Sequence, residues 1–138
     1  MWRELIQKLF PVCEFEPPAE QSQILEVETA LGVKLPQELK EILLEANGVI
    51  GEWGVWYIWK LDRIRTSNLS FRQNLTNNYM PFDHLLFFAD VGNGDQFTYG
   101  IIAGEIKKSD IYSWYHEDDS RVWEAANLQK YLEKRAKS

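Results

Sequence analysis

Residues 24–48, ILEVETALGVKLPQELKEILLEANG, carry the clearest structural signal in the chain, which is a helix, a sharp elbow and a second helix. In the first half, Ile24, Val27 and Leu31 recur at the spacing of one helical face. Gly32 follows directly, at the position where a helix C-cap favours a residue in the left-handed conformation. The first helix is therefore expected to end at this glycine.

The second helix of this stretch is expected to begin at Pro36. The first turn of a helix tolerates proline, because the N–H that proline lacks would have no partner there. An apolar stripe at helical spacing follows, and Asn47-Gly48 supplies a stop signal. The stripe is formed by Leu39, Ile42, Leu43 and Ala46. Residues 24–48 are thus predicted to form a helical hairpin.

The rest of the sequence predicts helices at both ends of the chain and strands between them. The terminal helices are marked by apolar stripes, formed by Trp2, Leu5, Ile6 and Leu9 and by Leu128, Tyr131 and Leu132. Strands are expected at residues 55–59, 85–89, 97–101 and 111–116, where apolar residues run together or alternate. This order predicts a single α+β domain over residues 1–138, with a mainly antiparallel sheet of about four to six strands covered by helices.

Two further segments are interpreted from local patterns. Residues 66–79 are rich in Ser, Thr and Asn, and this composition predicts a long surface loop. Trp2 and Trp123 lie in or near helical stripes, so we expect both side chains in the core.

Composition limits the cellular setting. Cys13 is the only cysteine, which excludes an internal disulfide framework and a cysteine-based zinc site and fits a reducing compartment. The first residues show no secretory signal pattern, and no run of about 18 apolar residues occurs. We expect a cytoplasmic protein that does not interact with a membrane.

Charge is unevenly distributed. Residues 1–52 hold ten acidic and four basic side chains, whereas the remainder holds eleven of each, so the net charge of −6 belongs to the N-terminal part. Such a surface repels nucleic acid and attracts a basic protein at low salt, with Glu38, Glu41 and Glu45 as candidate steering charges. The alternative is that these glutamates are simply the solvated faces of helices.

No catalytic constellation is visible. The two histidines, His84 and His116, have no nucleophile motif near them, and His116 with Asp118 and Asp119 would make only a weak cation site. The glycines at residues 92–94 precede a strand, whereas phosphate loops precede a helix. We expect neither an enzyme nor a bound metal or cofactor.

Six tryptophans are the most unusual feature of the composition. Tryptophan is enriched among the residues that anchor protein interfaces. Trp53 and Trp56 lie beside Gly51 and Gly54 in a segment that begins like a loop, so one of them is expected to be exposed at a groove.

Several of these features, in the same order, resemble the SUKH superfamily, which includes bacterial immunity proteins and fungal cell-wall-assembly regulators. The resemblance covers nearly the whole chain and continues through the Trp-rich segment 53–59, the apolar strand 85–89 and the aromatic stretch 112–116. It rests on the superfamily's motif residues, which here are Glu28, Gly32, Pro36, Asn47, Gly48, Gly94 and Asp95.

The resemblance implies a non-enzymatic immunity protein that binds and neutralises a cognate bacterial toxin by occlusion. Such toxins are frequently nucleases, so the implied partner includes a basic nuclease domain. Acidic residues would steer the partner and aromatic residues would slow its dissociation. The predicted contact residues are Glu52, Trp53, Trp56, Asp118 and Asp119.

Two other functions stay open at this level. The fungal relatives imply a regulatory adaptor that binds another protein without any toxin. The aromatic residues Trp56, Tyr99 and Trp114 could instead line a pocket in a small-molecule binding module.

Overall fold

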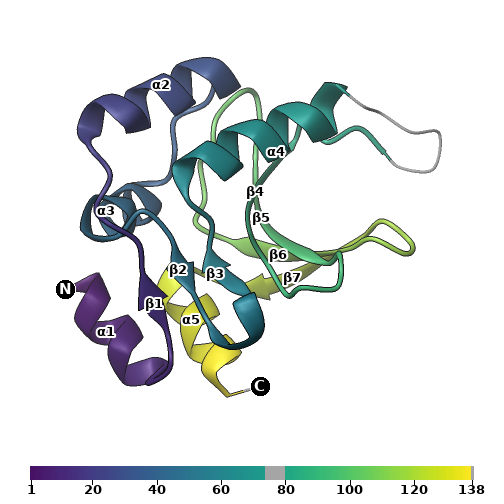
Figure 1. Ribbon diagram of the computed structural model, residues 1–138. Helices are drawn as coiled ribbons and strands as arrows, with labels where there is room; N and C mark the ends of the chain where they lie inside the picture. Colours follow the sequence, from purple (N-terminus) through teal and green to yellow (C-terminus); the bar gives the residue numbers. More distant parts are fainter. Residues whose placement is uncertain (74–79, 138) are drawn as a thin grey trace.

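The computed structural model describes residues 1–73 and 80–137, which form helices packed around two antiparallel sheets (Figure 1). The helical elements are α1 (Trp2–Leu9), α2 (Gln21–Leu31), α3 (Gln37–Glu45), the 3-10 turn η1 (Glu52–Gly54), α4 (Leu61–Gln73) and α5 (Leu128–Ala136). The strands are β1 (Glu14–Phe15), β2 (Val49–Ile50), β3 (Trp56–Ile58), β4 (Leu85–Asp90), β5 (Gln96–Gly100), β6 (Ile111–Tyr115) and β7 (Ser120–Ala125).

The α2–α3 hairpin is confirmed. Gly32 adopts the left-handed conformation at φ 67°, and its N–H donates to the Glu28 carbonyl at 2.9 Å. The Glu28 carboxylate then accepts from the Leu35 N–H at 2.8 Å, so one side chain ties the end of α2 to the start of α3. Pro36 is the N-cap of α3.

The sheets follow the order β1-β2-β3 and β4-β5-β6-β7, and every pairing is antiparallel. The two sheets meet where the Trp59 N–H donates to the Phe88 carbonyl at 2.7 Å. The α+β class and the antiparallel pairing are confirmed. The strands divide between two sheets, whereas the sequence predicted one. The sequence did not predict β1 and β2, because two-residue strands are too short to leave a pattern.

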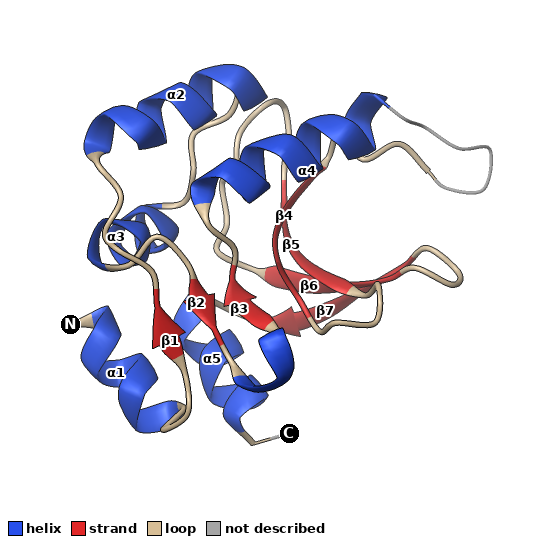
Figure 2. Cartoon of the chain, viewed as in Figure 1, coloured by secondary structure: helices blue, strands red, loops and turns tan. Residues whose placement is uncertain are grey.

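Helices cover both faces of the four-stranded sheet (Figure 2). On one face, Phe71 of α4 contacts Phe87 edge-on, with ring centroids 5.0 Å apart. On the other, Tyr131 of α5 contacts Phe88 and Phe97 at 5.3 and 4.8 Å. Consecutive strand residues point to opposite faces, so adjacent phenylalanines of β4 serve both helices.

The prediction of a loop at residues 66–79 is wrong over its first half. α4 continues to Gln73, and Asn68, which contributes to the polar composition, is 1% exposed. Its amide bonds to the backbone of Ile64 and Phe87, which makes a polar side chain compatible with burial. Residues 74–79 lie outside the described part of the chain.

The two tryptophans predicted to be in the core differ in outcome. Trp2 is buried as expected, at 6% exposure. Trp123 is 54% exposed and lies on β7, a strand that the helical interpretation missed. β7 is the outer strand of its sheet, so its side chains are covered by fewer neighbours. None of the helices in the described ranges is both long and apolar enough to cross a membrane.

Candidate protein-binding surface

Trp53 is the most exposed large apolar residue of η1 and of the surface around it. Its side chain is 94% exposed, and its backbone adopts φ 65° and ψ 19°. The left-handed conformation costs a non-glycine residue about 1–2 kcal/mol. Gly51, the residue before η1, packs against the Tyr57 ring, and a Cβ at this position would overlap that ring. Only glycine therefore fits at the start of η1.

A groove of about 610 Å³ opens beside Trp53. η1 contributes Glu52 and Trp53, and α5 contributes Arg135. Phe10, the residue directly after α1, also lines the groove. Phe10 stacks on Tyr57, with ring centroids 4.1 Å apart, and this pair forms part of the apolar wall. The structure therefore places Glu52 and Trp53 together at a groove, as the sequence predicted for one of the two loop tryptophans.

Trp56 lies on a different hollow. Its side chain is half-buried, and a Cβ added at Gly48 would approach the Trp56 ring to 2.7 Å. Gly48 has φ 114°, so both its conformation and this close approach require glycine. The hollow that Trp56 lines is smaller, includes Arg63 and Asp90, and is separate from the groove beside Trp53.

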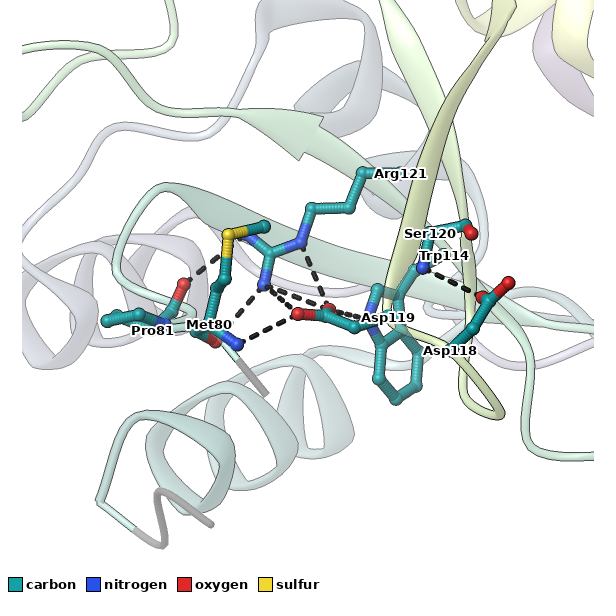
Figure 3. Close-up of polar contacts among 7 residues, drawn as sticks. All are labelled: Met80, Pro81, Trp114, Asp118, Asp119, Ser120 and Arg121. Atoms are coloured by element: carbon teal, nitrogen blue, oxygen red, sulfur yellow. Dashed lines mark hydrogen bonds and ion pairs between the residues drawn. The ribbon is translucent and has the colours of Figure 1, made fainter. Parts of the chain in front are cut away.

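Asp119 organises the β6–β7 hairpin from within (Figure 3). Its carboxylate accepts from the Trp114 indole at 2.6 Å and from the Met80 N–H at 2.8 Å, and it pairs with Arg121 at 3.0 Å. Burial would raise the pKa of Asp119, but the hydrogen bonds from Met80, Trp114 and Arg121 outweigh it and hold the pKa below its ordinary value. The side chain is only 9% exposed, so its carboxylate is engaged within the chain.

Asp118, in contrast, lies on the surface. Its carboxylate accepts from the Ser120 N–H at 3.0 Å and points away from the Asp119 cluster (Figure 3). Hydrogen bonds from the hydroxyl and N–H of Ser120 lower the pKa of Asp118, so this exposed group is ionised at neutral pH.

The β4–β5 turn lies between η1 and the β6–β7 hairpin and packs against both. A Cβ at Gly92 would lie 3.2 Å from Val55, and a Cβ at Gly94 would lie 2.9 Å from the His116 ring. Asp95 accepts from the His116 N–H at 3.0 Å and lies 2.7 Å from its Nδ1. Glu52 and Trp53 are therefore separated from the β6–β7 hairpin by this turn, and Asp118 does not line the groove beside Trp53.

The three glutamates predicted to act as steering charges are engaged by neighbouring helices. Glu45 accepts from the amino terminus and from the N–H groups of Trp2 and Arg3, so it caps α1. Burial would raise the pKa of Glu45, but these hydrogen bonds lower it. Glu41 accepts from the Trp2 indole at 3.3 Å, and Glu38 accepts from the Leu128 N–H at 2.6 Å at the start of α5.

The family motif residues all occupy structural positions. Besides Glu28, Gly32 and Pro36 in the hairpin, Asn47 accepts from the Leu61 N–H at 2.8 Å at the start of α4. Gly48 accommodates Trp56, while Gly94 and Asp95 hold the end of β6 through His116. The motif residues therefore contribute to the architecture, and none of them lines the groove beside Trp53.

The aromatic pocket suggested by Trp56, Tyr99 and Trp114 does not form. Tyr99 is fully buried against Phe88 on the α5 side of the sheet, whereas Trp114 packs on Phe87 on the α4 side. Three side chains on separate surfaces cannot line one cavity. Among the described residues, no three His, Cys, Asp or Glu side chains are grouped to hold a metal ion.

The sequence interpretation missed Arg135, which lines the groove beside Trp53. In the sequence it belongs to a run of charged residues at the end of a helix, and such residues are usually solvated. Only the packing of α5 against β3 and β5 shows that its guanidinium enters an aromatic environment.

Comparison with known proteins identifies the family. The family model described as SMI1-KNR4 cell-wall (SUKH_6) matches residues 21–132, which include both sheets except β1 and all helices except α1 and the end of α5. A search of curated proteins finds no match. Because the family model covers most of the sequence, this chain belongs to the SMI1-KNR4 (SUKH) family.

Proposed function

We propose that this protein is an immunity protein that binds and neutralises a bacterial toxin through the surface around η1. Family membership supports a general protein-binding role in immunity or regulation. The observation that carries the proposal is Trp53, a large ring held 94% exposed at the rim of a groove.

The position of Trp53 is costly for a residue with no role in folding. Its ring contributes nothing to the core, and its backbone is in a conformation that glycine adopts without strain. A tryptophan that becomes buried on association contributes large apolar area and an N–H donor, as interface anchors do. The surface therefore stabilises a complex at the expense of the free protein.

The acidic residues of this proposal fit a basic partner, although only Glu52 lies directly beside the anchor. Glu52 lies beside Trp53 at the groove, and Asp118 is exposed at the β6–β7 hairpin, away from the groove lining. Glu38, Glu41 and Glu45 keep their structural hydrogen bonds but add to the negative field of the N-terminal part. A basic nuclease domain is the toxin class that this field would attract, and occlusion of its cleft would neutralise it.

Trp56 and Asp119 take indirect parts in this proposal. Trp56 fixes the path of β3 beside η1 through its packing on Gly48, and Asp119 fixes the hairpin that carries Asp118. Their substitution would lower binding through the shape of the surface.

The test is affinity capture from the source lysate, at low and high salt, with the wild-type protein and two variants as baits. Trp53→Ala should lose the captured partner, and Trp123→Ala is the matched control, because it removes another exposed tryptophan on β7. A basic toxin domain captured by wild type and control, and more weakly at high salt, supports the proposal. Equal capture by Trp53→Ala would refute the surface, and capture of regulatory proteins alone would establish an adaptor instead.

A further inference from the structure

The groove beside Trp53 contains an arginine that no carboxylate of the described residues neutralises. The guanidinium carbon of Arg135 lies 4.7 Å from the ring centroid of Tyr57, 5.1 Å from that of Phe97 and 5.9 Å from that of Tyr131. Its Nη1 donates to the Tyr131 hydroxyl at 2.8 Å and to the Trp56 carbonyl at 3.4 Å. Both of these acceptors are neutral, so the positive charge is held in place without being paired.

The remaining donors of Arg135 have no hydrogen-bond partner among the described residues. An arginine has five N–H donors, and within the described residues the hydrogen bonds of Arg135 use Nη1. Neither Nε nor Nη2 is among the buried polar atoms that lack a partner. These two nitrogens are therefore accessible at the groove, and they form one edge of the planar fork that binds a carboxylate through two hydrogen bonds.

The other charges of the groove leave this position available. Glu52, Glu124 and Lys134 also line it. Glu124 pairs with Lys134 at 3.1 Å, and Glu52 is exposed on η1 and forms no ion pair with Arg135 in the described part of the chain. The rest of the wall includes the apolar side chains of Phe10, Val55 and Val91. A carboxylate entering this groove would meet a preorganised cation in a partly desolvated setting, where an ion pair is stronger than at an open surface.

We propose that this groove binds an acidic side chain of the protein partner, with the Arg135 fork on its carboxylate and Trp53 covering an adjacent apolar residue. This inference rests on the proposed function for the existence of a protein partner and adds the chemistry of the residue that the groove accepts. The two electrostatic effects act at different ranges. The net negative field attracts a basic partner over roughly 10 Å, whereas Arg135 selects a carboxylate at contact.

Three probe peptides, two with capped ends and one with a free C-terminal carboxylate, test whether the groove binds a carboxylate. The first is acetyl-Gly-Phe-Glu-Leu-Gly-amide, the second replaces Glu with Gln, and the third is the Gln peptide with a free C-terminal carboxylate. The readout is the Nε–H NMR signal of Arg135 in the labelled full chain. The Glu peptide should shift this signal saturably and bind at least about fivefold more tightly than the capped Gln peptide. Equal binding, or no shift at Arg135, would overturn the inference, and tightest binding of the uncapped peptide would assign the groove to a chain terminus.

Variants of α5 separate the fork geometry from charge alone. Arg135→Lys keeps the charge but removes the fork, and should weaken binding of the Glu peptide about fivefold. Lys130→Gln removes a positive charge from the same helix at a position paired with Glu133 and outside the groove, and should leave binding unchanged. Equal weakening by both variants would show that only net charge matters.

Two outcomes distinguish this inference from the proposed function. If Arg135→Lys does not fold, Trp53→Ala provides the second variant, because it leaves Arg135 intact and should still weaken the Glu peptide. If the Glu peptide does not bind while Trp53-dependent capture of the partner persists, the carboxylate inference is wrong and the proposed function stands. Peptide binding without Trp53-dependent capture would support the carboxylate site and count against the proposed function.

Discussion

The side chain of Asn68 in α4 forms two hydrogen bonds with the backbone of Phe87 in β4. These are the bonds that a neighbouring strand would otherwise form. Its side-chain carbonyl accepts from the Phe87 N–H at 2.8 Å, and its amide nitrogen donates to the Phe87 carbonyl at 2.9 Å. β4 is an outer strand of its sheet, so these groups would otherwise lack a strand partner. A helix side chain thereby closes part of a sheet edge inside the core.

Replacing Asn68 with leucine should destabilise the protein strongly. The change leaves the N–H and carbonyl of Phe87 buried without partners, and each such group costs about 1–3 kcal/mol. The expected loss in the free energy of unfolding is about 3 kcal/mol, measured by urea denaturation. Thr66→Ala is the control on the same helix, because Thr66 is exposed and its hydroxyl bonds to its own helix. A loss below about 1 kcal/mol for Asn68→Leu would show that the strand-like bonds contribute little.

Two buried tyrosines should respond in opposite ways to the loss of a hydroxyl. The hydroxyl of Tyr99 is buried with no hydrogen-bond partner among the described residues, whereas that of Tyr131 donates to the Tyr57 carbonyl at 2.8 Å. Tyr99→Phe should leave stability unchanged or raise it by up to about 1 kcal/mol, and Tyr131→Phe should lower it by about 1 kcal/mol. Thermal denaturation of both variants checks the contrast, and a destabilised Tyr99→Phe would reveal a partner such as an ordered water.

Asp119 should make the hairpin sensitive to acid. Its folded-state pKa is lowered from the ordinary 3.8, so the stability it contributes is present above that value and is lost as pH falls through the lowered pKa. Asp119→Asn should cost about 1–2 kcal/mol at pH 7, because the charge-assisted bonds from Arg121 and Trp114 weaken. The difference from wild type should shrink below about pH 4 in denaturation curves. Asp118→Asn is the matched control and should leave stability at pH 7 almost unchanged, because Asp118 is exposed.

Glu38 should have the opposite pH dependence. Burial raises its pKa above 4.5, partly offset by the Leu128 N–H, and the nearby charge of Glu41 adds to the increase. The folded state therefore binds this proton more tightly, and stability is lost as pH rises from 4.5 through the raised pKa. Glu38→Gln, which can still accept from Leu128, should be more stable than wild type at pH 7 and equal to it near about pH 4. A variant less stable than wild type at pH 7 would contradict this sign.

Trp53 should show a conflict between stability and binding. At φ 65°, Trp53→Gly relieves a strain that Trp53→Ala retains, so the glycine variant should be more stable than the alanine variant by about 1 kcal/mol. Both variants should lose the captured partner, since both remove the ring. Chemical denaturation gives the first comparison and affinity capture the second. If the two variants were equally stable, the left-handed backbone would not be strained.

The sequence by itself determined the elements that depend on local patterns. The hairpin of residues 24–48 follows from its apolar spacing, from Gly32 and from Pro36, and the strand predicted at 85–89 follows from an uninterrupted apolar run, although this run suggested a central strand and β4 is an outer one. These signals are local, because the backbone conformation of a few residues and one buried face suffice to specify them.

Only the tertiary structure decided which polar and aromatic residues are free to bind. In the sequence, Asn68 is typical of a loop, but in the fold it bonds to β4. Asp119 is typical of a surface acid, but Met80 and Arg121 bind its carboxylate. Arg135 is typical of a solvated helix residue, but its guanidinium packs on aromatic rings. Exposure and hydrogen-bond partners depend on residues distant in the chain, which is why Trp53 and Trp123 are exposed while Trp59 and Trp114 are buried.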